Sequence, residues 1–219
     1  MIHPYTEVRF INEKIGYGVV ATRFIPKGTI TWALDKLDRI FTPEQVSQMD
    51  SVYQQILDTY SYRNPEGNHV LCWDNARFVN HSSNSNCITT AYDFEIAVRG
   101  IHPGEELTDD YGYLNIEEPF EVVPEEGTDR TVVYPDDLLR YYHIWDEKLL
   151  HAFQDFLNVP QPLLRLIDAK IQEKAKRIAI GVEKMDSILN CHYVAPRNSV
   201  KNGKSHELAV RSPKVVYPF

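Results

Sequence analysis

Residues 77–87 read RFVNHSSNSNC, in which seven consecutive polar side chains follow directly on the apolar pair Phe78-Val79. A solvated turn explains the polarity, because Asn and Ser readily hydrogen-bond to their own backbone. The apolar pair favours a different interpretation, in which a strand anchored in the core presents the polar row to a site. This stretch alone leaves both interpretations open, so the segments around it have to decide.

Two further stretches carry unusual residue combinations. Residues 12–30 read NEKIGYGVVATRFIPKGTI, where the glycines permit a tight turn with positive φ. This stretch lacks the third glycine and the preceding strand of a dinucleotide-binding loop. Residues 98–115 read VRGIHPGEELTDDYGYLN. Their adjacent acids fit either an exposed hairpin end or a carboxylate pair for acid–base chemistry.

Taken together, in this order and spacing, the three stretches resemble the SET domain of protein lysine methyltransferases over about residues 6–115. The resemblance implies a fold of several small, mostly antiparallel β-sheets with a pseudoknot-like site. It also implies an enzyme that transfers a methyl group from S-adenosyl-L-methionine to the side-chain amine of a lysine in a protein. A histone or another basic protein is the expected substrate.

The resemblance assigns roles to individual residues. Tyr111 is the expected catalytic residue, while Asp109 and Tyr113 are expected to line the substrate channel. The backbone and side chains of six residues are expected to hold the cofactor: Gly16, Tyr17, Gly18, Arg77, Asn80 and His81.

The sequence departs from the family at the position of its usual zinc ligands. Ser83 stands where many members carry a cysteine, and Cys191 is the only cysteine after Gly112. We therefore expect no zinc and no other metal, because a zinc site needs four ligands. The helical segment from residue 138 onward, with Tyr141, Tyr142 and Trp145, is the candidate to cover the site instead.

A second departure is Asp109, which occupies a position where the family commonly has Phe or Tyr. The number of methyl groups transferred is therefore not readable from the sequence. Asp109 also supports an alternative, a SET-like interaction module that binds the cofactor but has weak or no catalysis. A methyltransferase acting on a small molecule or on a residue other than lysine is a third hypothesis.

Strand-like stretches cluster in the first half of the chain and helical patterns in the second, which predicts an α+β fold. The expected organisation is a SET domain over residues 1–115 with a helical insert at about 42–62, and an acidic linker over 116–134. A helical C-terminal region follows over 135–192, and a basic, loosely ordered tail over 193–219. Thr42, Pro43 and Gln45 match a helix start with a capping box.

Charge, cysteine content and hydrophobicity restrict the expected partners and the expected cellular location. The 219 residues carry a net charge of -8, which argues against binding to duplex nucleic acid and suits a lysine in a basic context. Three scattered cysteines without a CxxC pair predict a reducing, intracellular location, either cytoplasmic or nuclear. There is no signal-peptide pattern and no apolar run of eighteen residues, so no membrane association is expected. The C-terminal helices offer a surface for a homodimer.

Overall fold

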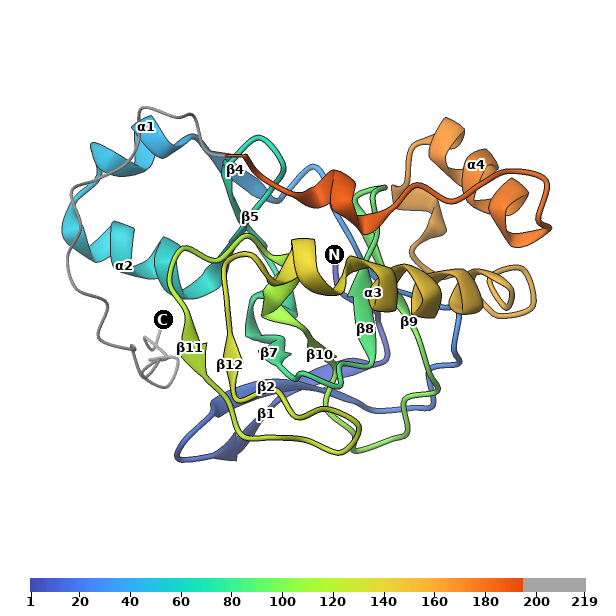
Figure 1. The fold of residues 1–219 in the computed structure, drawn as a ribbon, viewed down its shortest axis with the longest axis horizontal. Coiled ribbons are helices and arrows are strands. Elements are labelled where there is room, and N and C mark those ends of the chain that lie inside the picture. The colour runs from blue at the N-terminus through green and yellow to red at the C-terminus, as the bar shows by residue number, and fades with distance from the viewer. Residues whose placement is uncertain (195–219) are drawn as a thin grey trace.

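The computed structural model describes residues 1–194, so the expected tail lies outside the described residues from position 195 onward. The described part combines short helices with several small sheets, and the predicted α+β class is confirmed. In Figure 1, α1 and α2 lie at one end of the molecule and α4 lies at the other. None of the helices within residues 1–194 has the length and apolar character needed to cross a membrane.

Four of the small sheets are antiparallel. Their strands, in order within each sheet, are β1 (Thr6–Asn12) and β2 (Gly16–Ala21); β3 (Ile30–Ala33), β9 (Phe94–Ala97) and β8 (Cys87–Thr89); β4 (Arg39–Phe41), β6 (His69–Leu71) and β5 (Ser61–Arg63); β11 (Phe120–Glu121) and β12 (Val132–Val133).

The fifth sheet joins two motif segments that are far apart in the sequence. Strand β7 (Asn80–His81) pairs in parallel with β10 (Thr108–Asp109), with Asn80 opposite Thr108. The ladder continues into the following loop, where the Ser82 N–H donates to the Asp109 carbonyl over 2.9 Å. This short parallel pair lies near the middle of the molecule (Figure 1), where it brings two of the quoted stretches side by side.

The helical insert starts as its sequence predicts but is not continuous. α1 (Pro43–Ser47) has the predicted capping box, in which Thr42 Oγ1 accepts from the Gln45 N–H and Gln45 Oε1 accepts from the Thr42 N–H. α2 (Ser51–Tyr60) begins anew after Asp50, which adopts an extended conformation. Aspartate favours such N-cap positions over helix interiors, so Asp50 starts a new helix. The apolar stripe runs across both helices, and for this reason the sequence pattern predicts one continuous helix.

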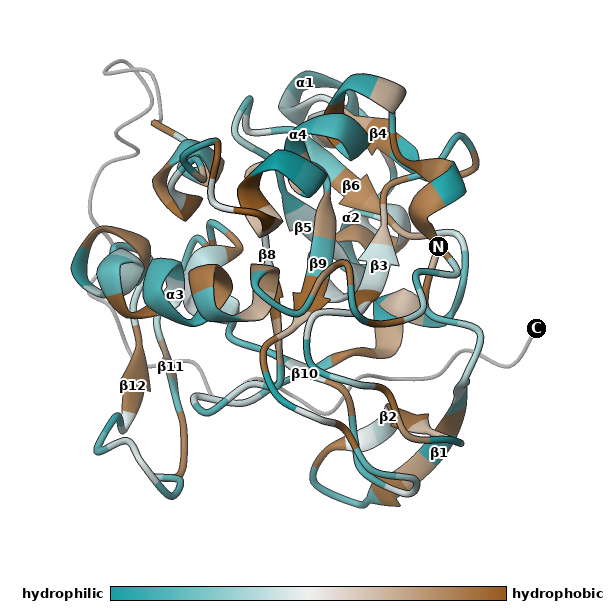
Figure 2. Cartoon of the chain, turned by 90° about the vertical axis from the view of Figure 1, so that its right-hand side faces the viewer, coloured by the Kyte–Doolittle hydropathy of each residue, from teal (hydrophilic) through white to brown (hydrophobic). Residues whose placement is uncertain are grey.

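The C-terminal helices are shorter than their sequence patterns suggest. α3 (Asp137–Phe153) matches the start of the predicted helix but ends before residue 157. α4 (Ala169–Ala179) stops well before residue 190, since Gly181 adopts φ +72° just beyond its end. A glycine in this left-handed conformation is a common helix terminator. Figure 2 shows that both helices carry hydrophobic as well as hydrophilic residues.

Two clusters of buried side chains form the core. The larger one packs α3 and α4 onto the sheet of β3, β9 and β8 through residues such as Phe94, Trp145 and Phe153. The smaller one lies around β2 and contains Val19, Trp32 and Leu107. Leu107 immediately precedes β10, so the motif segments are fixed by core packing on one side.

Residues 116–134, expected as an acidic linker, instead contain an ordered hairpin. β11 and β12 pair in antiparallel register, and an isolated bridge joins Glu125 to Thr128 near the tip. The sequence pattern conceals the hairpin because each strand is only two residues long and the intervening residues are mostly charged or turn-forming. We refer to residues 116–134 as the closing hairpin.

Candidate functional site

The carboxamide of Asn80 joins all three quoted stretches. Its Nδ2 donates to the Tyr17 carbonyl over 3.0 Å and to Glu106 Oε1 over 2.6 Å. Asn80 is buried, and its neighbours therefore fix the orientation of the amide. Because both amide hydrogens are donated within the protein, Oδ1 is the atom suited to accept a hydrogen bond from a ligand such as an ammonium group.

Any side chain at residue 18 would force the neighbouring Glu106 and Asn80 side chains to move. A Cβ atom there would lie 2.2 Å from Glu106 Oε1 and 2.9 Å from Asn80 Nδ2. Gly16 adopts φ +80°, a left-handed conformation that glycine tolerates without strain. Between these glycines, the Tyr17 side chain is 37% exposed and packs edge-to-face against Phe10. The turn thus brings backbone close to Asn80 and leaves one aromatic ring at the surface.

His81 is the second residue of β7, and its ring contacts three side chains: Ser83, Tyr111 and Phe120. Its Nδ1 accepts from the Tyr111 N–H over 3.1 Å, and its Nε2 lies 3.3 Å from Ser83 Oγ. Since Nδ1 acts as an acceptor, the neutral ring carries its proton on Nε2. The rings of Tyr111 and Phe120 lie 5.4 Å and 5.3 Å from the His81 ring.

Tyr111 begins a one-turn 3₁₀ helix over Tyr111–Tyr113, and its hydroxyl points toward the stretch of residues 77–87. The hydroxyl donates to the Val79 carbonyl over 2.8 Å. Val79 directly precedes Asn80, so the tyrosine hydroxyl and a backbone carbonyl meet beside the residues expected to hold the cofactor. A hydroxyl with a fixed partner has a defined direction, which is what an orienting group needs.

Asp109 and Tyr113, the expected channel residues, are both buried. The Tyr113 hydroxyl lies 3.0 Å from Asp109 Oδ1 and 3.0 Å from the Cys87 carbonyl. Asp109 also hydrogen-bonds to Glu95, and burial followed by this acidic neighbour raises the pKa of Glu95 well above its ordinary value. Burial and the neighbouring carboxyl group therefore both favour the protonated form of Glu95.

The rings next to this acid pair line a small cavity. Tyr113, Trp32 and Tyr62 contribute aromatic walls to a space of about 70 Å³. The indole of Trp32 packs edge-to-face on Tyr62 at 5.8 Å, and its Nε1 is buried without a hydrogen-bond partner among the described residues. These aromatic walls make the space largely apolar, and such a space disfavours a charged group by desolvation.

Arg77 lies at the start of the same motif, in a one-turn helix over Asn75–Phe78. Its guanidinium lies 5.2 Å from the centre of the Phe78 ring and Nη1 donates to the Trp73 carbonyl over 3.5 Å. Phe78 in turn packs against Tyr60 of α2. Arg77 thus lies just ahead of β7, three residues before Asn80.

Sequence reasoning missed residues whose role depends on distant partners. Asn86 is buried, and its carboxamide bonds to the Glu106 carbonyl over 2.8 Å and to the Thr108 N–H over 2.9 Å, as a neighbouring strand would. Arg130 was also missed. It is the only basic residue between positions 116 and 137, and this isolation within an acidic stretch was the available signal.

The closing hairpin also contacts the polar row of residues 80–86. Glu125 Oε2 accepts from the Ser82 hydroxyl and, over 3.2 Å, from the Asn84 N–H. Asn84 Nδ2 donates to the Glu126 carbonyl over 3.1 Å. Ser82 and Asn84, the two neighbours of Ser83, thus donate hydrogen bonds to carboxylate and carbonyl oxygens of the hairpin.

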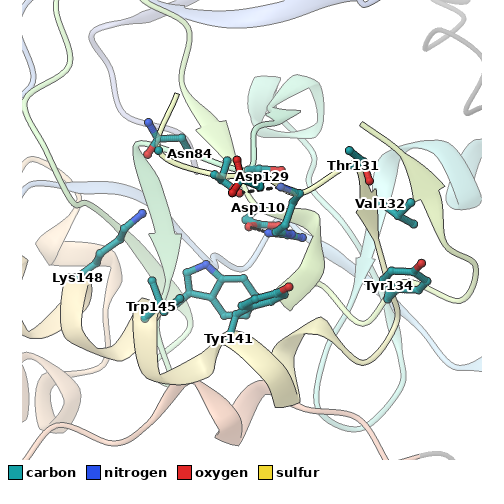
Figure 3. A pocket seen from close by; sticks show the side chains of 14 residues that line it. Asn84, Asp110, Asp129, Thr131, Val132, Tyr134, Tyr141, Trp145 and Lys148 are labelled. Atoms are coloured by element: carbon teal, nitrogen blue, oxygen red, sulfur yellow. Dashed lines mark hydrogen bonds and ion pairs between the residues drawn. The ribbon is translucent and has the colours of Figure 1, made fainter. Parts of the chain in front are cut away.

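A larger cavity of about 460 Å³ lies between this hairpin and α3 (Figure 3). Tyr141 and Trp145 of α3, with Lys148, face Asn84 and Asp110 across it. Trp145 also packs edge-to-face on Tyr113 at 5.1 Å, so α3 lies against the short helix that carries Tyr111, and its covering role stays a prediction. None of the six residues expected to hold the cofactor is among the residues that line it.

Within residues 1–194, no three His, Cys, Asp or Glu side chains are grouped so that they could hold a metal ion. Cys72, Cys87 and Cys191 carry free thiols. Burial raises the pKa of the Cys72 and Cys87 thiols well above the ordinary value. Both therefore remain protonated at neutral pH, which makes them poor metal ligands.

Residues 16–112 match the family model described as SET domain. A search of curated proteins finds no significant relative. The matched segment contains parts of all three quoted stretches, from Gly16 to Gly112, and ends just before Tyr113, ahead of the closing hairpin and α3.

Proposed function

We propose, from the premise that residues 16–112 form a SET domain, that this protein transfers a methyl group from S-adenosylmethionine to a lysine side chain. The SET domain defines a family of lysine methyltransferases. The observation that supports this activity most directly is the Tyr111 hydroxyl, which is directed at the Val79 carbonyl beside Asn80 and His81. The substrate we propose is a protein, either a histone or another basic protein.

The residues around Asn80 fit such a cofactor. Asn80 Oδ1 can accept from its ammonium group, and the exposed Tyr17 ring offers an aromatic surface for the remainder. Gly18 and Gly16 let the backbone approach closely, because no side chain intervenes. When bound, S-adenosylmethionine supplies a methyl carbon that is activated by a positively charged sulfur.

The chain's own residues then have two tasks. The first is to favour the neutral amine, since a free lysine has a pKa of about 10.4 and its ammonium has no lone pair. Aromatic walls such as Trp32, Tyr62 and Tyr113 disfavour a charged group by desolvation. The second is alignment: the Tyr111 hydroxyl and the Val79 carbonyl hold the amine in line with the methyl carbon.

Exposed acids on the closing hairpin support a basic sequence around the target lysine. Glu117 is paired with Arg63 and Glu125 contacts Ser82, but the remaining acids are exposed: Glu118, Glu121, Glu126 and Asp129. Opposite charge steers association of a basic segment, an effect that salt screens. We expect a lysine peptide with basic flanks to show a higher kcat/KM than one with neutral flanks, and expect this advantage to shrink at high salt.

The activity is tested by incubating the protein with methyl-labelled S-adenosylmethionine and a set of basic proteins, histones among them. Hydrolysis of the labelled protein and amino-acid analysis should identify N-methyl-lysine. Label in another methylated amino acid, or in a small molecule, would refute lysine as the acceptor.

A SET-like interaction module is the second candidate, and it rests on Asp109. This residue is engaged with Glu95 and Tyr113 in the interior, where the family commonly has an aromatic ring. Such a module would bind S-adenosylmethionine in calorimetry but transfer no methyl group to any protein in the same panel.

A further inference from the structure

We propose that Arg130, in the closing hairpin, is a positioning residue for Tyr111 and acts through Asp110. Arg130 lies outside the segment that matches the SET domain. The inference rests on the proposed function, since it takes Tyr111 as the residue that orients the amine.

Arg130 joins two buried acids. Its guanidinium bonds to both carboxylate oxygens of Asp110, with Nη2 3.2 Å from Oδ1, and donates to Asp137 Oδ2 over 2.7 Å. The Asp110 and Asp137 side chains are 0% and 1% exposed, and the Arg130 side chain only 12%. The guanidinium also lies over the Tyr141 ring, 5.0 Å from its centre, and both residues line the larger cavity.

Asp110 in turn holds the short helix that carries Tyr111. Its Oδ1 accepts from the Gly112 N–H over 3.0 Å, and its own N–H donates to the Tyr113 hydroxyl over 3.0 Å. Tyr111 lies between these two anchors, so a rotation of the Asp110 carboxylate would displace it. The same carboxylate lies 3.8 Å from His81 Nδ1, the atom that accepts from the Tyr111 N–H.

The charge on Arg130 determines the state of Asp110. Burial raises the pKa of Asp110, and the bonds to Arg130 oppose this rise. Without the guanidinium, an ionised carboxylate would be buried with no countercharge, and it would either become protonated or turn toward solvent. Either change alters the hydrogen bonds that define the turn before Tyr111.

The geometry favours arginine over lysine. A planar guanidinium can bond two carboxylates at once in fixed directions, whereas an ammonium group on a flexible stem cannot reproduce this fork. Arg130→Lys should therefore retain the charge but recover only part of the function.

The first test compares Arg130→Met with Arg140→Met, because Arg140 forms an exposed ion pair with Asp136. We expect Arg130→Met to lower kcat at least tenfold and to leave KM for S-adenosylmethionine within about threefold, with Arg140→Met unchanged. In labelled protein, the ¹⁵N resonance of His81 Nδ1 should shift in Arg130→Met, because this atom loses or lengthens its bond to the Tyr111 N–H. Unchanged kcat and an unchanged His81 resonance would overturn the inference.

A second variant separates positioning from simple closure of the hairpin. Adding Asp110→Asn to Arg130→Met removes the unpaired charge and keeps an oxygen that can accept from the Gly112 N–H. The double variant still lacks the bonds from Arg130 that attach the hairpin. Recovery of kcat and of the His81 resonance supports action through Asp110. Failure to recover in a folded double variant overturns it. If the wild-type protein methylates nothing, the proposed function fails, while the His81 resonance still tests the link to Arg130.

Discussion

The paired strands β7 and β10 and the closing hairpin hold the two sides of one site by different means. On the first side, side-chain amides bond to backbone and to neighbouring motif residues, as Asn80 and Asn86 do. On the second side, charged groups provide the attachment: Glu125 accepts from Ser82 and Asn84, and Arg130 bonds to Asp110. The first side is matched by a family model and the second is not.

The hairpin makes its contacts beside Ser83, where the sequence lacks the cysteine that many SET domains carry. Ser82 and Asn84, on either side of Ser83, are bonded by oxygen atoms of the hairpin. Arg130 adds a buried link from the hairpin to the residue before Tyr111. These contacts attach the hairpin through charge and hydrogen bonding. Single substitutions can therefore weaken the attachment and leave the paired strands intact.

The largest effect on cofactor binding is expected on the side of the paired strands, from Gly18→Ala. The new methyl group would collide with Glu106 Oε1 and Asn80 Nδ2, which are themselves bonded to each other. Separating them releases the Asn80 amide from its fixed orientation. We expect affinity for S-adenosylmethionine to fall more than tenfold, measured by calorimetry.

Gly127→Ala is the matched control, in the closing hairpin. Gly127 also has a positive φ of +86°, but no atom lies within 4 Å of the position of its Cβ. The substitution should cost about 1 kcal/mol of stability through backbone strain and leave cofactor affinity unchanged. Equal losses of affinity in the two variants would contradict the distinction between the two sides.

A smaller effect is expected from the acid pair behind the paired strands. Because the pKa of Glu95 is raised in the folded state, the unfolded chain ionises first as pH increases above the ordinary value of 4.5. The folded protein therefore loses stability with rising pH until Glu95 itself ionises. Urea unfolding at pH 5 and pH 8 should show that Glu95→Gln loses less stability over this interval than wild type, by on the order of 1 kcal/mol.

The exposed Glu121 of β11 provides the control for that measurement. Glu121→Gln should retain the wild-type dependence on pH. Identical pH dependence of wild type and Glu95→Gln would show that Glu95 does not hold a proton preferentially in the folded state.

The most local effect is expected from Glu125→Ala in the hairpin. It removes the acceptor of the Ser82 hydroxyl and the Asn84 N–H, two hydrogen bonds worth about 1 kcal/mol each at most sites. Amide hydrogen exchange should accelerate in residues 120–133 and stay unchanged in β7 and β10. In Glu126→Ala, where the contact to Asn84 uses only the backbone carbonyl, exchange should match wild type.

Local patterns were sufficient for the elements whose cause is local. The capping box at Thr42 and the antiparallel strands of the first half follow from residue types at short spacing. The motif order also identified the fold. The end of α4 was overestimated, because an apolar stripe continues past the residue at which Gly181 changes the backbone direction.

The closing hairpin could not be predicted in the same way. Its two-residue strands carry too little alternation, and its acids suggest a solvated linker until their partners are known. Arg130 acquires its role only because Asp110, twenty residues earlier, is buried beside it. Asn86 similarly looks like any turn residue until β10 lies against it.

The most direct test of the proposed site compares cofactor binding and methyl transfer in wild type and Tyr111→Phe. The substitution removes only the hydroxyl that donates to the Val79 carbonyl, and leaves the ring and the His81 contact to the Tyr111 backbone in place. We predict an unchanged dissociation constant for S-adenosylmethionine and a loss of transfer to lysine of about 100-fold or more. Transfer at the wild-type rate in Tyr111→Phe would contradict the assignment.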